Sequence, residues 1–381
     1  MAEVSPDAPD LIVFYGRGGE SEPERLVAGA QRASVRQLCA DARDAGVFRR
    51  LVLATNDRAL AQELGGGGAD LLVVETGDTI VFGEQLRAIV GQLDSAAVVY
   101  VGGGSAPLLD IAGLRLLVAA IEQPGQVAAN NALSSDWVGF RPADALARTA
   151  PILTDNDLAW RLHHDAGLAR VPLDANLATT LDIDTPTDLA LLRLAPGVPP
   201  LLRRYLDDAV PDFPALPAIE ALLIDPYRTL IIAGRVNVGI LAAVERQVSF
   251  LKRLFIEERG MRASGRQARG EVRTLLAVLL HEVGPERFFA LLATLGDGLL
   301  FDTRPLFAHL APDLSAADRF ASDLLRPELI GNPLVRDFTA AARDAGIPIL
   351  LGGHALVTGG LALLATRARV AKEGLNEGLA G

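Results

Sequence analysis

Short apolar runs alternate with longer amphipathic segments through the first 200 residues. The runs cover residues 11–15, 51–55, 71–74 and 97–101, and a charged segment with helical spacing lies at about 24–45. Continuously apolar strands separated by helices are typical of a parallel sheet with helices on both faces. We therefore predict a three-layer α/β domain with a mostly parallel sheet. Ligands of such sheets bind beyond the carboxyl ends of the strands, so the residues after each run are the first candidates for a site.

The pattern changes after residue 195. Prolines at 196, 199, 200, 211, 214 and 217 interrupt a stretch with little periodicity, which is typical of a domain connection. We predict an α/β domain at 1–195, a connection at 196–217 and a mainly α-helical domain at 218–381. In the last domain, strand-like runs at 229–233 and 347–351 could form a small sheet, and helical spacing recurs near 238–258, 264–281, 284–295, 314–325 and 334–345.

Residues 347–366 form a long apolar segment whose only titratable side chain is His354. A segment of this length could cross a membrane. Glycine pairs at 352–353 and 359–360 divide it into a short strand-like run and a short helix-like run. We therefore expect a buried strand, turn and helix rather than a membrane anchor.

The acidic excess is concentrated in the first domain. The net charge is −11, and residues 1–200 contain 26 acidic against 15 basic side chains. An acidic chain with only two lysines, Lys252 and Lys372, is unsuited to general nucleic-acid binding. The single cysteine, Cys39, forms no internal disulfide, and no secretory leader is evident at Met1, so we expect a cytoplasmic protein. Gly-x-Ser-x-Gly and zinc-peptidase histidine motifs are missing from the sequence, which disfavours these hydrolases.

Glycines and aspartates follow two of the predicted elements. Residues 102–104 are three glycines after an apolar run, a context that lets backbone amides approach a phosphate, although a tight turn explains them equally well. Asp182 and Asp184 stand at i and i+2 of an extended segment, so both carboxylates can face one divalent cation. The following Thr185 and Pro186 are typical of a helix start.

These aspartates belong to the sequence Asp-x-Asp-Thr-Pro-x-Asp-Leu at residues 182–189. Its position near the end of an alternating domain resembles the nucleotidyltransferase superfamily with the GT-A type fold. Further similar segments, in the same order as in the family, are 83–86, 99–109, 134–142 and 155–167. Within the superfamily the chain looks most like the 2-phospho-L-lactate guanylyltransferases and the molybdenum-cofactor nucleotidyltransferases. The resemblance covers about residues 10–195, and residues 218–381 resemble no family that we recognise.

The resemblance implies transfer of a nucleotidyl group from a nucleoside triphosphate, GTP favoured, to a small phosphorylated or anionic acceptor, with release of pyrophosphate. It implies Mg²⁺ (or Mn²⁺) as cofactor and catalytic roles for Arg17, Asp182 and Asp184, with the two aspartates as metal ligands. The implied nucleotide-binding residues are Gly16, Gly18, Gly19, Gly83, Gln85, Gly103, Gly104 and Ser105, and the acceptor-binding residues in this domain are Ser134, Ser135 and Asp136. A homo-oligomer is left open.

Two departures from the family leave a second interpretation open. Ser105 stands where the family has a metal-binding aspartate, and a hydroxyl binds Mg²⁺ far less well than a carboxylate. The first domain has no lysine, so Arg17 and Arg25 must neutralise phosphate, which arginine can do. The alternative is a catalytically degenerate protein that binds a ligand or partner without turnover. A GT-A glycosyltransferase is disfavoured, because its aspartate pair lies mid-sheet rather than at the end of the domain.

Four arginines of the second domain recur with the spacing of one helix face: Arg262, Arg266, Arg269 and Arg273. They could bind the anionic acceptor or pair with neighbouring glutamates, and glycines at 260, 265 and 270 weaken the helical interpretation. Residues 302–304 (Asp-Thr-Arg) read as a helix cap with a local ion pair or as part of a ligand site.

Overall fold

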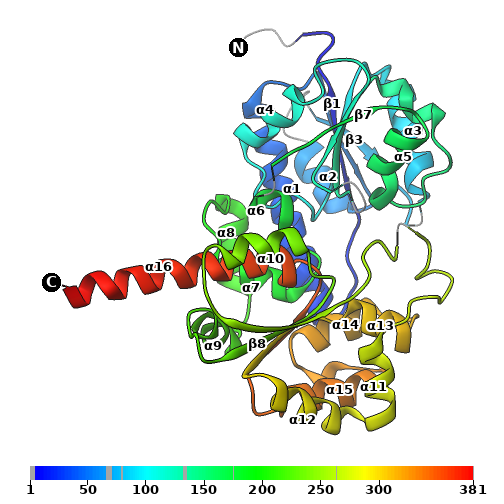
Figure 1. Ribbon diagram of the computed structural model, residues 1–381. Helices are drawn as coiled ribbons and strands as arrows, with labels where there is room; N and C mark the ends of the chain where they lie inside the picture. Colours follow the sequence, from blue (N-terminus) through cyan, green and yellow to red (C-terminus); the bar gives the residue numbers. More distant parts are fainter. Residues whose placement is uncertain are drawn as a thin grey trace. The chain divides into compact units, whose positions relative to one another are not determined.

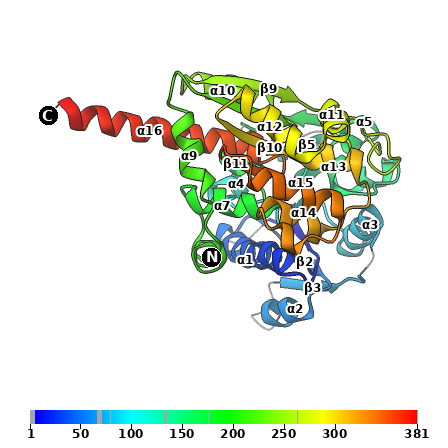
Figure 2. The same cartoon turned by 90° about the horizontal axis from the view of Figure 1, so that it is seen from below.

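The chain divides into two compact units, each built on its own sheet (Figures 1 and 2). The computed structural model describes residues 5–65, 71–78, 80–131, 135–174, 176–262 and 264–380, with side chains to residue 373. Unit 1 comprises residues 1–18, 28–183 and 197–205, and unit 2 comprises residues 19–27, 184–196 and 206–381. Helices α1 (Glu22–Ala45) and α8 (Pro200–Ala209) therefore contain residues of both units.

The sheet of unit 1 has seven strands in the order β3-β2-β1-β4-β6-β5-β7. Six of these strands run in one direction and β6 runs against them. The mostly parallel sheet predicted from the pattern is thus confirmed. The strands are β1 (Asp10–Tyr15), β2 (Leu51–Thr55), β3 (Leu71–Glu75), β4 (Val98–Gly102), β5 (Gln126–Ala129), β6 (Trp137–Arg141) and β7 (Ala169–Val171).

Both faces of this sheet are buried, which is why its strands are apolar without alternation. Leu11 and Val13 of β1 belong to a core that includes Leu38 of α1. Ile12 and Phe14 belong to a second core that includes Leu86 of α3. Figure 1 shows α3 and α5 on one side of the strands and α4 on the other. The helices of unit 1 are α2 (Arg58–Gly65), α3 (Phe82–Leu93), α4 (Ile111–Ala119), α5 (Leu158–His164) and α6 (Leu177–Thr180), with 3₁₀ helices at Ala143–Arg148 and Asp155–Asp157.

Unit 2 contains a four-stranded parallel sheet in the order β11-β10-β8-β9. The strands are β8 (Thr229–Gly234), β9 (Leu251–Ile256), β10 (Gly298–Asp302) and β11 (Ile349–Gly352). The strand-like runs predicted at 229–233 and 347–351 are confirmed as β8 and β11. The helix predicted at 238–258 is wrong in its second half, because residues 251–256 form β9.

Helices surround the sheet of unit 2. An apolar core on one face joins Phe301 of β10 to Phe288 of α12 and Phe338 of α15, and Figure 2 shows α12, α14 and α15 beside one another. Helices α7 and α9 contact β11. The helices are α7 (Pro186–Leu194), α9 (Ala215–Leu222), α10 (Val238–Glu245), α11 (Leu275–Val283), α12 (Pro285–Leu295), α13 (Arg304–Leu310), α14 (Ala316–Asp323), α15 (Pro333–Arg343) and α16 (Leu361–Ala380), with a 3₁₀ turn at Pro327–Leu329.

The apolar segment 347–366 forms β11, a π-helical turn at Leu356–Gly360 and the start of α16, so the expected strand, turn and helix are confirmed. Among the residues that the structure describes, no helix combines the length and the apolar character needed to cross a membrane.

Candidate functional site

A pocket of about 630 Å³ lies in unit 1, where β1, β2 and β3 end side by side at their carboxyl ends. This is the edge at which the sequence predicts a ligand. The pocket is lined by Arg17, Arg32, Thr55, Asn56, Asp57, Arg58, Ala59, Glu75, Thr76, Gly77 and Asp78. Three guanidinium groups and three carboxylates therefore face a space large enough for a nucleoside-sized ligand.

Asn56 connects the loops that follow the three strands. Its side-chain oxygen accepts a hydrogen bond from the backbone N–H of Arg17 at 2.7 Å, and its Nδ2 donates to Asp78 Oδ1 at 3.1 Å. The loop after β1 is thus fixed to the segment after β3 through a residue at the end of β2. Gly16 and Gly18 lie in this same first loop beside Arg17, while Gly19 belongs to unit 2.

The arginines of the pocket differ in their pairing. Arg32 contacts Asp57 at 3.4 Å and Glu63 at 3.1 Å. Arg58 is exposed and makes no ion pair or hydrogen bond within the described part of the chain. Because of this exposure, the Arg58 guanidinium is available to an anionic ligand. Burial, together with the nearby Asp57 carboxylate, raises the pKa of Tyr15 to about 12, so this phenol stays protonated beside the pocket.

The glycines after β4 make close backbone contacts. A Cβ on Gly103 would lie 2.8 Å from Tyr15 Cδ2, and one on Gly104 would lie 2.8 Å from the Ile183 carbonyl oxygen. Gly104 also accepts a hydrogen bond from the Ile183 N–H at 2.7 Å. These glycines let the loop approach β1 and the segment that leads to Asp182. Their packing role is evident, and nucleotide binding by them stays a prediction.

Two further predicted nucleotide-binding residues lie in the first turn of α3. The N–H of Gly83 donates to the Ile152 carbonyl at 3.0 Å, and a Cβ on Gly83 would lie 2.6 Å from that oxygen. Gln85 is half-buried one turn into the same helix. Neither residue lines the pocket of unit 1.

Ser105 holds the loop after β4 in place. Its hydroxyl lies 2.7 Å from the carbonyl oxygen of Gly102 and 2.8 Å from that of Asp136. It therefore links the end of β4 to the residue before β6. Asp110, the nearest following carboxylate, caps α4 by accepting from the Gly113 N–H at 2.8 Å.

The predicted acceptor side lies before β6. Asp136 Oδ2 accepts from Asn130 Nδ2 at 3.0 Å, and Asn130 Oδ1 accepts from the Asp136 N–H at 3.1 Å. Ser135 is buried, and its hydroxyl donates to the Asp155 carbonyl at 2.9 Å. Ser134 lies outside the described residues. Asp136 is thus a half-buried carboxylate in a hydrogen-bonded turn.

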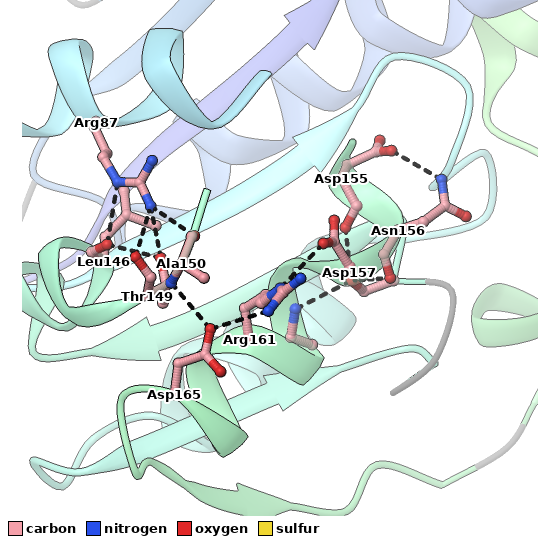
Figure 3. Close-up of polar contacts among 11 residues, drawn as sticks. Arg87, Leu146, Thr149, Ala150, Asp155, Asn156, Asp157, Arg161 and Asp165 are labelled. Carbon is pink, nitrogen blue, oxygen red and sulfur yellow. Dashed lines mark hydrogen bonds and ion pairs between the residues drawn. The ribbon is translucent and has the colours of Figure 1, made fainter. Parts of the chain in front are cut away.

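Next to this turn, a polar network braces the segment 155–165 (Figure 3). Arg161 reaches both Asp157 and Asp165 at 3.4 Å, and Asp165 accepts from the Ala150 N–H at 3.0 Å. Asp155 Oδ2 accepts from the hydroxyl of the buried Tyr100 at 2.8 Å. Burial, followed by the Asp155 carboxylate, raises the pKa of Tyr100 well above its usual value.

The boundary between the units falls within the aspartate motif, so Asp182 belongs to unit 1 and Asp184 to unit 2. Asp182 is buried, whereas Asp184 is exposed. As predicted, Thr185 caps α7: its hydroxyl accepts from the N–H of Asp188 at 3.2 Å, and Pro186 is the first helical residue.

Within unit 2, Asp184 and His354 each present a ligand atom within 4.8 Å of the other. Asp188 accepts the Asp184 N–H on Oδ2 at 3.1 Å, while its buried Oδ1 has no hydrogen-bond partner among the residues that the structure describes. Burial, then the Asp184 carboxylate, raises the pKa of Asp188 to about 8. Burial, then the Arg235 charge, lowers the pKa of His354 to about 4, so this imidazole is neutral at pH 7. Neutral imidazole and carboxylate oxygens are competent divalent-metal ligands, so this donor set fits an ion.

The carboxyl edge of the unit 2 sheet carries two ion pairs. Asp302, at the end of β10, receives Arg235 Nε at 2.6 Å and Arg235 NH2 at 3.0 Å. Arg304 pairs with Asp323 of α14 at 3.0 and 2.5 Å. Both carboxylates are completely buried. The local ion pair suggested for residues 302–304 is therefore wrong: Asp302 pairs with Arg235 and Arg304 pairs with Asp323, while the backbone N–H of Arg304 donates to Asp302 Oδ1, at 3.2 Å.

The predicted arginine stripe is not helical. Residues 264–273 form turns, in which Gly265 and Gly270 adopt φ values of +70° and +63°, and α11 begins only at residue 275. Arg269 pairs with Glu271 at 2.9 Å, and Arg273 NH1 donates to two nearby carbonyls. Positive φ at two glycines breaks the helix on which the single face depended. The other two members, Arg262 and Arg266, lie in the same turns.

Sequence reasoning pointed to the segments after β2 and β3, yet it assigned no role to the pocket residues within them. Asn56, Asp57 and Asp78 directly follow apolar runs, a signal that was present. Arg32 lies on α1 and is brought to the pocket only by tertiary packing. The pairing of Arg304 with Asp323 gave no sequence signal either, because nineteen positions separate them.

No protein-family model matches the sequence, and no curated protein matches it. Among solved structures, the chain is similar to a nucleotidyl transferase from Methanothermobacter thermautotroptrophicus (17% identity, TM-score 0.39, 49% of this chain and 96% of the other). It is similar to a cytidylyltransferase from Leptospira borgpetersenii (15%, TM-score 0.37, 49% and 85%). A third is 4-diphosphocytidyl-2C-methyl-D-erythritol synthase from Anaerococcus prevotii (11%, TM-score 0.32, 43% and 87%).

Proposed function

We propose that unit 1 binds a nucleoside triphosphate in the pocket beyond β1, β2 and β3 and transfers its nucleotidyl group to a small phosphorylated or anionic acceptor. The observation that carries this proposal is the pocket itself, which has three arginines at the carboxyl edge of a parallel sheet. The motif order from residue 83 to residue 189 supports the same chemistry. In this reaction an acceptor oxygen bonds to the α-phosphorus, the bond from that phosphorus to the α–β bridging oxygen breaks, and pyrophosphate leaves.

The charges of the pocket suit the two ends of such a ligand. Arg17 and Arg58 can form bidentate hydrogen bonds to phosphate oxygens. Asp57 and Asp78 offer carboxylate acceptors for a base that presents ring and amino N–H donors on one edge, as guanine does. GTP is therefore the triphosphate that we favour. Transfer of this kind needs alignment and charge neutralisation more than a proton-transfer residue.

Asp182 and Asp184 are the residues that would hold Mg²⁺ or Mn²⁺, and a bound ion would neutralise charge on the triphosphate. Carboxylate oxygens are the ligands that Mg²⁺ prefers. On the acceptor side, Asp136 with its partner Asn130 would orient the acceptor substrate. The backbone N–H groups of the loop after β4 would lie near the ribose of the nucleotide.

Isothermal titration of the full chain with GTP, ATP and CTP in the presence of Mg²⁺ tests the binding step. We expect GTP to bind most tightly, and R17Q and R58Q each to weaken it about tenfold, because each removes a charged hydrogen bond to phosphate. R148Q is the matched control, since Arg148 is an exposed arginine whose one ion pair in the described part of the chain is with Asp144. Absence of binding by all three nucleotides would refute the proposal.

A second candidate is nucleotide or partner binding without turnover. It is favoured by Ser105, whose hydroxyl is already engaged with two backbone carbonyls in place of a metal-binding carboxylate. Pyrophosphate release separates the two candidates. Release by the wild type that is lost in D182A and D184A supports transfer, whereas binding without release, with release gained in S105D, supports the degenerate protein.

A further inference from the structure

Unit 2 has its own topological switch point, independent of the pocket in unit 1. From β8 the chain passes through α10 to β9 on one side of the sheet, and it later returns to β10 on the other side of β8. Helix α13, which follows β10, packs in the core that contains Phe301 and Phe338, whereas α10 contacts α16. In open parallel sheets, ligands bind beyond the carboxyl ends of the two strands that flank such a reversal.

The carboxyl ends of β8 and β10 carry charged side chains rather than apolar ones. Gly234 ends β8 with φ +117°, and a Cβ there would lie 2.4 Å from the Asp302 Cβ. Only glycine permits this approach, which brings Arg235 into its two hydrogen bonds with Asp302. Buried ion pairs are weak evidence for stability, because apolar residues of similar volume often replace them without loss, so we consider a role in binding for the charge at this edge.

Three more guanidinium groups adjoin these pairs without a carboxylate partner among the described residues. Arg259 NH1 donates to the Arg235 carbonyl at 2.9 Å, and Arg319 NH1 donates to the Leu314 carbonyl at 2.9 Å. Arg319 lies one helical turn from Asp323, the partner of Arg304, and Arg262 is exposed in the turn after β9. Burial, then the Arg304 and Arg262 charges, lowers the pKa of Arg319 to about 10. Each of these cations adds positive charge beside the two ion pairs, and like charges repel one another unless an anion compensates them.

The acidic residues nearby do not cancel this charge. Glu258 is engaged by Arg266 at 3.3 Å. Burial, then the carboxylates of Glu258 and Asp302, raises the pKa of Glu257 to about 7, so a large fraction of Glu257 is neutral at pH 7. Asp184 is a further carboxylate whose charge acts on Arg319, but one carboxylate does not balance three arginines. Arg259, Arg262 and Arg319 therefore leave surplus positive charge beside the switch point.

We propose that the carboxyl edge of β8 and β10 binds the phosphate group of a small phosphorylated molecule, with Arg259, Arg262 and Arg319 as its ligands. Guanidinium groups give phosphate paired, directional hydrogen bonds, and their positive charge compensates the dianion. The proposal uses no residue of the pocket in unit 1 and does not depend on the function proposed there. The buried Arg235–Asp302 and Arg304–Asp323 pairs position the surrounding loops.

Hydrogen exchange of the full chain, followed by mass spectrometry with inorganic phosphate as the probe, tests this site. The reporters are the amides of Arg235, Thr303 and Arg304, which donate to Asp302 or to the Gly352 carbonyl. We expect phosphate, at constant ionic strength, to slow their exchange, and the phosphate concentration that gives half of this effect to rise about tenfold in R259Q and in R319Q.

R262Q provides an exposed substitution should R319Q, which is half-buried, lose its fold. R343Q is the matched control, since the one ion pair of Arg343 among the described residues is with the exposed Asp344 at 3.2 Å, and it should respond like the wild type. The proposal would be overturned if phosphate left exchange at the three reporters unchanged, or if R259Q and R262Q were protected at the same phosphate concentration as the wild type. R17Q should show the same protection by phosphate as the wild type. If the protein is protected by phosphate but does not bind GTP, this site is supported and the function proposed for unit 1 is refuted.

Discussion

The two sheets of this protein place buried carboxylates at opposite edges. In unit 1, Asp10 is buried at the amino end of β1, away from the pocket. In unit 2, Asp302 is buried at the carboxyl end of β10, where ligands of parallel sheets bind. The carboxyl edge of unit 1 is instead an open pocket whose polar side chains are half-buried or exposed. The same architecture therefore uses buried charge for anchoring in one unit and at the ligand edge in the other.

The partners of these carboxylates differ in their access to water. Asp10 is held by Arg49 and Arg50, whose side chains are 28% and 36% exposed. Asp323 is held by Arg304, which is only 11% exposed. An arginine that loses its carboxylate can be hydrated in the first case and much less in the second. Loss of the carboxylate should therefore cost more in unit 2 than in unit 1.

The largest effect is expected for Asp323→Ala. It leaves the Arg304 guanidinium buried without its carboxylate, so we expect the free energy of unfolding of unit 2 to fall by about 3–5 kcal/mol. Hydrogen exchange of the β10 and β11 amides measures it. The two tryptophans of the chain, at 137 and 160, both lie in unit 1, so tryptophan fluorescence reports unit 1 separately. D344A, which removes an exposed carboxylate, should change stability by less than about 0.5 kcal/mol. A D323A variant as stable as D344A would contradict this account.

Asp10→Asn should destabilise unit 1 by less, about 1–3 kcal/mol at pH 7 in urea unfolding followed by tryptophan fluorescence. Burial alone would raise the pKa of Asp10, but hydrogen bonds from Arg49 and Arg50 outweigh it and the pKa lies below its usual value. A lowered carboxyl pKa stabilises the fold above the unfolded pKa of about 4, and the gain is lost as the pH falls through the folded value. The difference between wild type and D10N should accordingly shrink in acid, and a difference that grows there would be incompatible with the pairing.

Glu257→Gln should stabilise unit 2, and only at higher pH. Because the folded pKa of Glu257 is raised to about 7, ionisation costs stability from the unfolded pKa of about 4.5 upward, and the cost is complete above pH 7. We expect no gain for E257Q at pH 4 and a gain on the order of 1 kcal/mol at pH 8, measured by exchange of the β8 and β9 amides. E282Q, which changes an exposed glutamate, is the matched control for the substitution. A gain for E257Q that is the same at pH 4 and pH 8 would rule out this cause.

A further prediction concerns Cys39, which is 2% exposed in the core of unit 1. Burial raises the pKa of its thiol to about 11, so little thiolate is present at pH 7. A disulfide reagent should label native protein at least about a hundredfold more slowly than urea-unfolded protein. Rapid labelling of the native chain, with unchanged fluorescence, would mean that unit 1 opens far more readily than its packing indicates.

The apolar runs of unit 1 were predictable because both faces of its sheet are buried, so each strand reads as an uninterrupted apolar segment. In unit 2, β8 and β11 were found for the same reason. Strand β9 was missed because Leu251–Ile256 includes Lys252 and Arg253 and can be read as a continuation of the preceding helix. The helix predicted at 264–281 failed because glycines at 265 and 270 take positive φ, which the amphipathic spacing does not reveal.

Among the candidate-site residues, those next to predicted strands could be found from the sequence, whereas those on helices could not. Residues that follow a predicted strand, such as Asn56, could be identified from their position alone. Asp302 is the last residue of β10, a strand that the apolar pattern did not predict. Residues that reach a site from a helix could not be found in this way, and Arg32, Arg319 and Asp323 belong to this class. Their relevance depends on tertiary packing between segments far apart in the sequence, which no local pattern records.

The interleaving of the two units has a consequence for synthesis. Helix α7 belongs to unit 2, where the Thr187 hydroxyl donates to the Leu351 carbonyl at 2.5 Å, across 164 positions of the chain. At ribosomal rates of about 5–20 residues per second, β11 emerges roughly 10–30 s after α7. During that interval the buried leucines of α7, Leu189, Leu191 and Leu192, have no native partner from the end of the chain. Translation of β11 thus sets the earliest moment at which the sheet of unit 2 can be completed.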